Sequence, residues 1–180
     1  TGFIEFRRNE LGVRSETTES LRDIFTGCLT LLYRLLFLLY AESRNLLPSD
    51  DRNPYYKKSL RRLKEDICRD IRTTGTEHLS HNAYDFWSRL ESLCRIIDKG
   101  DKALNIPIYN GGLFETHEGS FLSRHKISDP FVASAVEKLT VDHEVEHPVE
   151  STAYIDYSSL SVRHLGDIYE GLLEFHVRIA

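Results

Sequence analysis

The most restrictive feature of this sequence is an apolar stretch at residues 29–48, which reads LLYRLLFLLYAESRNLLP from Leu31. Its apolar residues recur at helical spacing and cover most sides of the segment. The pattern predicts a helix from about Ser20 to Arg44, with Ser20 and Asp23 as a capping pair at its start. A helix that is apolar on most sides is either the buried centre of a helical domain or a membrane span.

The details of the stretch favour a buried central helix over a membrane span. The uninterrupted apolar run is shorter than the ~20 residues that a bilayer requires, because Arg34 interrupts it and Asp23 and Glu42 lie close to its ends. We expect Arg34 to pair with a carboxylate or to extend to the surface. The most buried residues of the helix are expected to be Leu32, Leu35, Leu36 and Leu39.

Helical periodicity recurs in four later segments, at about residues 56–73, 83–99, 130–140 and 159–175. Gly75 and Gly100 follow two of these segments and are typical of helix ends. Near the start, Phe3, Ile4 and Phe6 suggest a short strand. The sequence therefore predicts an all-α fold, an irregular multi-helix domain built around the buried central helix and joined by structured loops. The residues expected to form the core of the four later helices are Leu60, Leu63, Ile67, Ile71, Phe86, Trp87, Leu90, Leu93, Cys94, Ile97, Phe131, Val132, Ala135, Val136, Leu139, Leu160, Leu165, Ile168, Tyr169, Leu172 and Leu173.

The 180 residues are enough for one domain and part of a neighbouring domain. Residues 1–18 are interpreted as the tail of an upstream domain or an extended lead-in, 19–176 as the helical domain, and 177–180 as the start of a truncated downstream domain. The chain begins at Thr1 and has no Met, which is typical of a piece of a longer protein. Its three cysteines, Cys28, Cys68 and Cys94, form no metal-binding pair and are expected to be buried free thiols in a reducing compartment.

The charge is unevenly distributed along the chain. The net charge of −5 argues against nucleic acid coating the whole surface, but residues 1–72 carry a net charge of +3 and the remainder −8. Part of the positive charge of residues 1–72 belongs to a basic cluster that could contact DNA phosphates. Alternatively, the cluster could be a solvated helix face paired with Glu65, Asp66 and Asp70. Beside it, Tyr55 and Tyr56 could stack on a base or pack on the helix start. The basic cluster consists of Arg52, Lys57, Lys58, Arg61, Arg62 and Lys64.

Two short motifs suggest chemistry that their surroundings do not support. Residues 143–147 read HEVEH, the spacing of a zinc protease, but that site requires a helix, and Pro148 and the acidic neighbours indicate a loop instead. Residues 53–56 read NPYY, which is similar to the base-binding motif of DNA amino-methyltransferases. This copy lacks the second proline and follows no apolar strand, so it indicates a helix start. No glycine-rich loop follows a predicted strand, and we expect no metal, no bound cofactor and no catalytic residue in this chain.

Several stretches in a fixed order carry a family resemblance: residues 31–48, then IPIYNGGLFE at 106–115, FLSRHKISD at 121–129 and YSSLSVRHLGDIYEGLLEF at 157–175. Together they resemble the helical region that precedes the methyltransferase core in type IIG restriction–modification enzymes and in BREX (Pgl-type) DNA adenine-N6 methyltransferases. The resemblance covers most of residues 20–176. The motif positions, which it implies are structural, are Tyr40, Glu42, Arg44, Tyr109, Asn110, Gly111, Gly112, Gly166, Tyr169 and Glu170.

The resemblance implies a cytoplasmic, prokaryotic parent enzyme that methylates adenine N6 in a specific DNA site, with S-adenosylmethionine as its cofactor. The implied partners are double-stranded DNA and the flanking catalytic and N-terminal domains of the same polypeptide, with no membrane. This chain would then be a non-catalytic connector or scaffold, because no catalytic position of the family maps onto it. Residues 1–18 lack the nuclease signature, so cleavage of DNA by the parent is left open. The alternative is a stand-alone helical protein-interaction module with no enzymatic parent.

Overall fold

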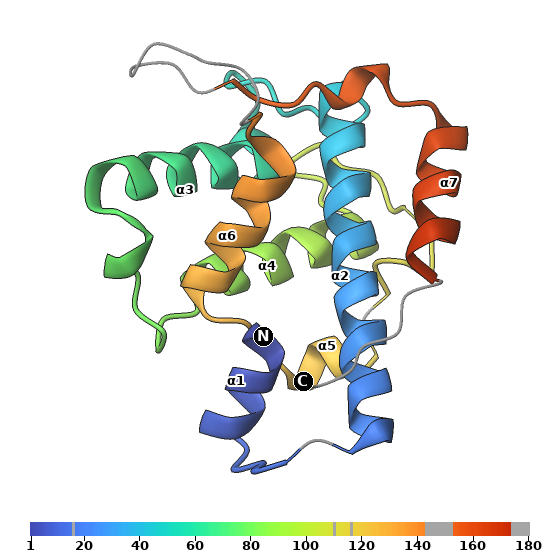
Figure 1. Cartoon of the computed structure of the whole chain (residues 1–180). Coiled ribbons are helices and arrows are strands. Elements are labelled where there is room, and N and C mark those ends of the chain that lie inside the picture. The colour runs from blue at the N-terminus through green and yellow to red at the C-terminus, as the bar shows by residue number, and fades with distance from the viewer. Residues whose placement is uncertain (16, 110, 116, 143–152, 174–180) are drawn as a thin grey trace.

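The computed structural model describes the chain except for residues 16, 110, 116, 143–152 and 174–180 (Figure 1). The described part is built from helices and contains no strand, which confirms the all-α prediction. Short 3-10 turns η1 (Pro54–Lys58), η2 (Thr76–His78) and η3 (Tyr157–Ser159) lie in the connections. The α-helices are α1 (Gly2–Asn9), α2 (Thr18–Ser43), α3 (Leu60–Thr74), α4 (Asp85–Lys99), α5 (Phe121–Arg124), α6 (Asp129–Thr140) and α7 (Val162–Leu173).

Helix α2 is the long central helix that the apolar stretch predicts, and it packs against α3, α5 and η3 (Figure 1). It begins slightly earlier than expected, because Thr17 and Ser20 form a capping box: the backbone N–H of each residue donates to the side-chain oxygen of the other. Leu35, Leu36 and Leu39 are buried as predicted, whereas Leu32 is only half-buried. Leu38, which the prediction omitted, is fully buried.

By length and composition, α2 is also the one helix in the described part that could cross a membrane. The same test is passed by core helices of water-soluble proteins, and 44% of its most apolar window is buried inside this fold. The buried positions lie mainly in its C-terminal half, where the helix contacts the rest of the core. These contacts favour the central-helix interpretation.

The core between α2, α3, α4 and α6 agrees closely with the helical periodicity. All six predicted core residues of α4 are buried, and so are Leu60, Leu63 and Ile67 of α3. In α6, Val132 and Val136 are buried as predicted, whereas Phe131, Ala135 and Leu139 are only half-buried, as is Ile71 of α3. Ala133 and Thr140, which the prediction omitted, are buried. Gly100 ends α4 with a positive φ of 70°, a conformation that favours glycine.

The strand predicted near Phe3 is wrong, because residues 2–9 form helix α1. Phe3 is 3% exposed, and its ring makes edge contacts with the rings of Trp87 and Phe121 at centroid distances of 5.8 and 5.1 Å. Three apolar residues within four positions can lie on one side of a helix turn as well as in a strand, so this short pattern is ambiguous. The α1 segment is therefore part of the same hydrophobic core as α4 and α5.

Two further burial predictions need correction. Helix α7 forms close to where it was expected, but Ile168 is 36% exposed, and Leu160 and Leu172 are only half-buried rather than part of a buried core. The side chains of Leu165, Tyr169 and Leu173 lie outside the described residues. Cys68 and Cys94 are buried free thiols as predicted, whereas Cys28 lies on an exposed side of α2. The apolar positions of α2 cover most of its circumference, so the sequence did not show which side faces solvent.

Candidate nucleic-acid interface

The basic cluster is positioned by Glu42, a buried carboxylate at the end of α2. Its Oε1 accepts hydrogen bonds from the Tyr55 hydroxyl at 2.9 Å and from the Leu60 backbone N–H at 2.8 Å. Its Oε2 accepts one from the Arg61 N–H at 2.7 Å. A carboxylate at this place satisfies free N–H groups in the first turn of α3 and interacts favourably with the helix dipole. Burial raises the pKa of Glu42, and these three hydrogen bonds oppose the increase.

The NPYY segment has the helix-start role that its context predicts. The Asn53 side chain accepts a hydrogen bond from the Tyr55 N–H at 3.2 Å, and Pro54 opens η1. Tyr55 is fully buried and so is not available to stack on a base. Tyr56 donates from its hydroxyl to Glu65 at 2.5 Å, and the guanidinium carbons of Arg61 and Arg62 lie 5.8 and 5.9 Å from its ring centre.

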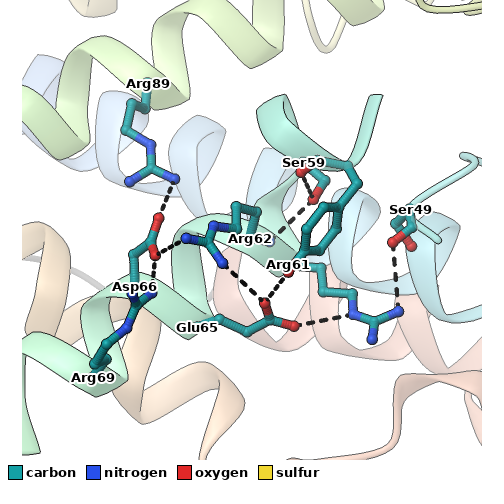
Figure 2. A network of polar contacts seen from close by, with 9 residues as sticks. Ser49, Ser59, Arg61, Arg62, Glu65, Asp66, Arg69 and Arg89 are labelled. Carbon is teal, nitrogen blue, oxygen red and sulfur yellow. Dashed lines mark hydrogen bonds and ion pairs between the residues drawn. The ribbon is translucent and has the colours of Figure 1, made fainter. Parts of the chain in front are cut away.

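Arginines from α3 and α4 meet around two carboxylates, in what we call the arginine network (Figure 2). Glu65 accepts from Arg61 at 3.2 Å and lies 4.0 Å from Arg62. Asp66 is surrounded by three guanidiniums: Arg62 at 2.9 Å, Arg89 of α4 at 3.0 Å, and Arg69. Arg61 also donates to the Ser49 carbonyl at 3.5 Å. The network comprises Arg61, Arg62, Arg69, Arg89, Glu65 and Asp66, so four positive charges surround two negative ones.

The structure divides the predicted basic cluster into engaged and free cations. Arg61 and Arg62 belong to the arginine network, and Arg52 pairs with Asp50 at 3.1 Å on the surface. Lys64 is half-buried with its Nζ 4.0 Å from the ring centre of Tyr154, and burial lowers its pKa. Lys57 and Lys58 are exposed on η1 and have no ion pair within the described part of the chain. These two lysines are therefore the cations most available to a phosphate.

Sequence reasoning did not include Arg69 and Arg89 in the cluster. Arg69 lies on the same helix, two turns after Arg61 and Arg62, and its i,i+3 spacing from Asp66 was a usable signal. Arg89 lies on α4, 23 positions from Asp66, so its contribution depends on the packing of α4 against α3. Single-sequence periodicity does not specify that packing.

Hydrogen bonds join the stretches that carry the family resemblance. Near the end of α2, the Tyr109 hydroxyl donates to the Leu46 carbonyl at 3.1 Å, and Arg44 donates to the Ser158 carbonyl at 3.0 Å. The Arg44 guanidinium also lies 5.8 Å from the ring centre of Tyr40. These bonds connect residues 31–48 with both 106–115 and 157–175.

Arg34 adds a further connection and corrects a prediction. Its Nε donates to the Leu113 carbonyl at 2.8 Å and its Nη2 to the Glu115 carbonyl at 3.2 Å. It neither reaches the surface nor pairs with a carboxylate among the described residues, because the loop at 113–115 closes over it and offers backbone acceptors. These bonds fix the loop against α2.

The remaining motif positions are spread along the loop and along α7. Gly111 and Gly112 lie in the loop with open space around them. Gly166 and Glu170 are exposed on α7. Asn110 and the side chain of Tyr169 lie outside the described residues.

No group of three or more His, Cys, Asp or Glu side chains in the described part could hold a metal ion. The HEVEH segment at 143–147 lies outside the described residues.

Comparison of the chain with protein-family models, curated proteins and solved structures found no match.

Proposed function

We propose that this chain is a non-catalytic helical connector of a site-specific DNA adenine-N6 methyltransferase, of the restriction–modification or phage-defence type, in a prokaryotic cytoplasm. The observation that carries the proposal is the hydrogen bonding between the resembling stretches. Tyr109 bonds to Leu46, Arg44 to Ser158, and Arg34 to two carbonyls of residues 113–115. Stretches that form one motif set are expected to form one structural unit, and these bonds join residues 31–48 with 106–115 and 157–175.

The surface formed by η1 and the arginine network is the part that we assign to duplex DNA. The four arginines exceed the two carboxylates by two charges, and Lys57 and Lys58 add two more. Guanidinium and ammonium groups bind phosphate oxygens without regard to sequence, so this surface would orient DNA rather than read it. S-adenosylmethionine and the pocket for the flipped adenine belong to the neighbouring catalytic domain of the proposed parent.

A separate apolar feature supports contact with a flanking domain. Leu46, whose carbonyl accepts the Tyr109 hydrogen bond, has a side chain that is 56% exposed. Ile108, the neighbour of Tyr109 in the sequence, is 60% exposed. Contiguous exposed apolar surface is typical of protein–protein interaction sites. We assign this surface to the contact with the catalytic domain.

Charge reversal at the free lysines tests the DNA assignment. Lys57→Glu with Lys58→Glu should weaken binding of a duplex oligonucleotide by about tenfold or more at low salt, and should lower the slope of log affinity against log salt by about 2. Fluorescence anisotropy measures both quantities. The matched control is Lys102→Glu with Lys126→Glu, which reverses two exposed lysines outside the cluster and should have a smaller effect. Equal affinities for the two double variants would remove the DNA assignment.

The coding sequence around this chain tests the parentage. The proposal expects a strand and a glycine-rich loop shortly downstream, followed by an Asn-Pro-Pro-aromatic motif. Calorimetry should show no binding of S-adenosylmethionine to the chain itself, and micromolar binding would place part of the cofactor site here. The alternative, a stand-alone interaction module, draws on the exposed side chains of α7 such as Ile168. A coding sequence without methyltransferase motifs would favour that alternative.

A further inference from the structure

We propose that the cleft between α2, α4 and α5 binds a small molecule that carries one anionic group on an apolar body. The cleft has a volume of about 480 Å³, within the usual range of small-molecule sites. This site is independent of the proposed DNA surface. Its apolar and buried lining comprises Leu31 and Arg34 of α2, Trp87, Leu90 and Cys94 of α4, and Leu122 of α5.

The preference for an anion comes from Arg34. Its side chain is 7% exposed, and its charge is met by two neutral carbonyls, by the Cys94 side chain, and by the ring of Phe114, whose centre lies 5.9 Å from the guanidinium carbon. No carboxylate pairs with it among the described residues. Cys94 does not act as a counter-ion, because burial raises the pKa of its thiol to about 11. A buried cation without a counter-ion is unfavourable, so an anionic ligand group would compensate it.

Trp87, a residue of the cleft wall, carries a second buried donor. The indole Nε1–H of Trp87 is buried and has no hydrogen-bond partner within the described part of the chain. An unpartnered buried donor is destabilising, and a carboxylate or sulfonate oxygen is a suitable acceptor for it.

The cleft rim limits the ligand to a small charge. It carries Arg95 and Lys99 together with Glu91 and Asp98, so it adds no net charge and would not attract a polyanion. The leucines of the three helices supply the apolar contacts. A mono-anionic amphipathic molecule, such as an aromatic or aliphatic carboxylate, matches this combination.

Fluorescence can test the proposal, because Trp87 is the one tryptophan of the chain. The probes are 1-anilinonaphthalene-8-sulfonate and its neutral analogue N-phenyl-1-naphthylamine. We expect the sulfonate to bind saturably at one site and to accept energy from Trp87, with an affinity about tenfold or more above that of the neutral probe. Arg34→Met should remove this difference between the probes.

Variants of two serines separate the cleft from other surfaces and do not alter the Arg34 contacts. Ser92→Phe places a ring on the α4 wall of the cleft and should abolish saturable binding. Ser123→Phe makes the same change at an exposed position of α5 that does not line the cleft, and should bind both probes as the parent chain does. The proposal is overturned by binding that does not saturate, that survives Ser92→Phe, or that is equal for the charged and neutral probes.

Discussion

At the scale of single residues, the buried carboxylates of this protein act as helix caps supplied from distant parts of the chain. Glu42 accepts from the first turn of α3, and Asp129, at the start of α6, accepts from the Phe86 N–H at the start of α4 at 2.9 Å. In both cases burial raises the pKa of the carboxyl group, while hydrogen bonds from backbone N–H groups oppose the increase. Each carboxylate thereby fixes the position of one helix relative to another.

Glu42→Gln should destabilise the fold even though the side chains have nearly the same shape. A carboxylate accepts from all three donors, but an amide presents its NH₂ group to at least one of them and leaves that donor unpaired. The expected cost is about 1–3 kcal/mol in the free energy of unfolding, measured with urea. The comparison is Tyr55→Phe, which removes one donor and keeps both backbone bonds, with an expected cost of about 1 kcal/mol. Equal stability of Glu42→Gln and the parent chain would contradict the capping role.

The difference in stability between the parent chain and Glu42→Gln should depend on pH. Because burial raises the pKa of Glu42, the folded chain holds this proton to a higher pH than the unfolded chain, in which the pKa is about 4.3. Between those two pKa values the stability contributed by this group falls as the pH rises. The stability difference between the parent chain and Glu42→Gln should therefore narrow as the pH rises from acid toward neutral. A difference that widens over that range would show that the hydrogen bonds outweigh burial.

At the scale of the helices, periodicity predicted those that bury one side against several neighbours, as in α3, α4 and α6. It failed for α1, where the apolar pattern was too short to distinguish a helix from a strand. It also failed for α7, because periodicity does not show whether another element covers the apolar side of a helix. For the candidate site it identified Arg61 and Arg62 of α3 and the two lysines of η1, but not Arg69 of the same α3 helix. It could not supply Arg89, the carbonyl partners of Arg34 or the capping role of Glu42, because each depends on contacts between segments far apart in the sequence.

The packing of α5 against α2 makes a specific prediction for Gly27. In a helix interior Gly is usually less stable than Ala by about 1 kcal/mol, but a Cβ at position 27 would lie 2.2 Å from the ring of Phe121. That ring stacks on His125 at a centroid distance of 4.0 Å, so it has little freedom to move. Gly27→Ala should therefore destabilise the fold by about 1–3 kcal/mol. Gly166→Ala on α7, with open space around it, should be neutral or slightly stabilising in the same thermal unfolding measurement.

The arginine network predicts opposite effects of one substitution on stability and on binding. Asp66→Asn removes the charge that three guanidiniums share, so it should lower stability by up to about 1 kcal/mol at low salt, since these pairs are partly exposed. It also raises the net charge of the surface by one, and affinity for duplex DNA should increase. Urea unfolding and anisotropy in parallel check the two signs, and both effects should diminish with added salt. A loss of DNA affinity would indicate that Asp66 orients the arginines for binding.

At the scale of the whole molecule, the fold is held by contacts between the two ends of the chain and its centre. Phe3 from the first helix packs on Trp87 and Phe121, and Ser158 from the last part of the chain accepts a hydrogen bond from Arg44, at the end of α2, at 3.0 Å. The sequence suggested that residues 1–18 belong to another unit. A single buried aromatic residue can connect such a segment to the main core, and composition does not reveal this.

Phe3→Ala measures whether the first helix unfolds with the rest of the domain. The ring is nearly fully buried among residues of α4 and α5, so its loss should cost about 3–5 kcal/mol and shift the whole unfolding transition, followed by far-UV circular dichroism. Leu11→Ala is the control, because Leu11 is 50% exposed and its truncation should change stability by less than about 0.5 kcal/mol. If Phe3→Ala left the main transition in place, residues 1–18 would be a separate tail, as their sequence alone suggested. A single shifted transition would instead make α1 part of the cooperative unit that positions α4, and with it Arg89 and the wall of the proposed ligand cleft.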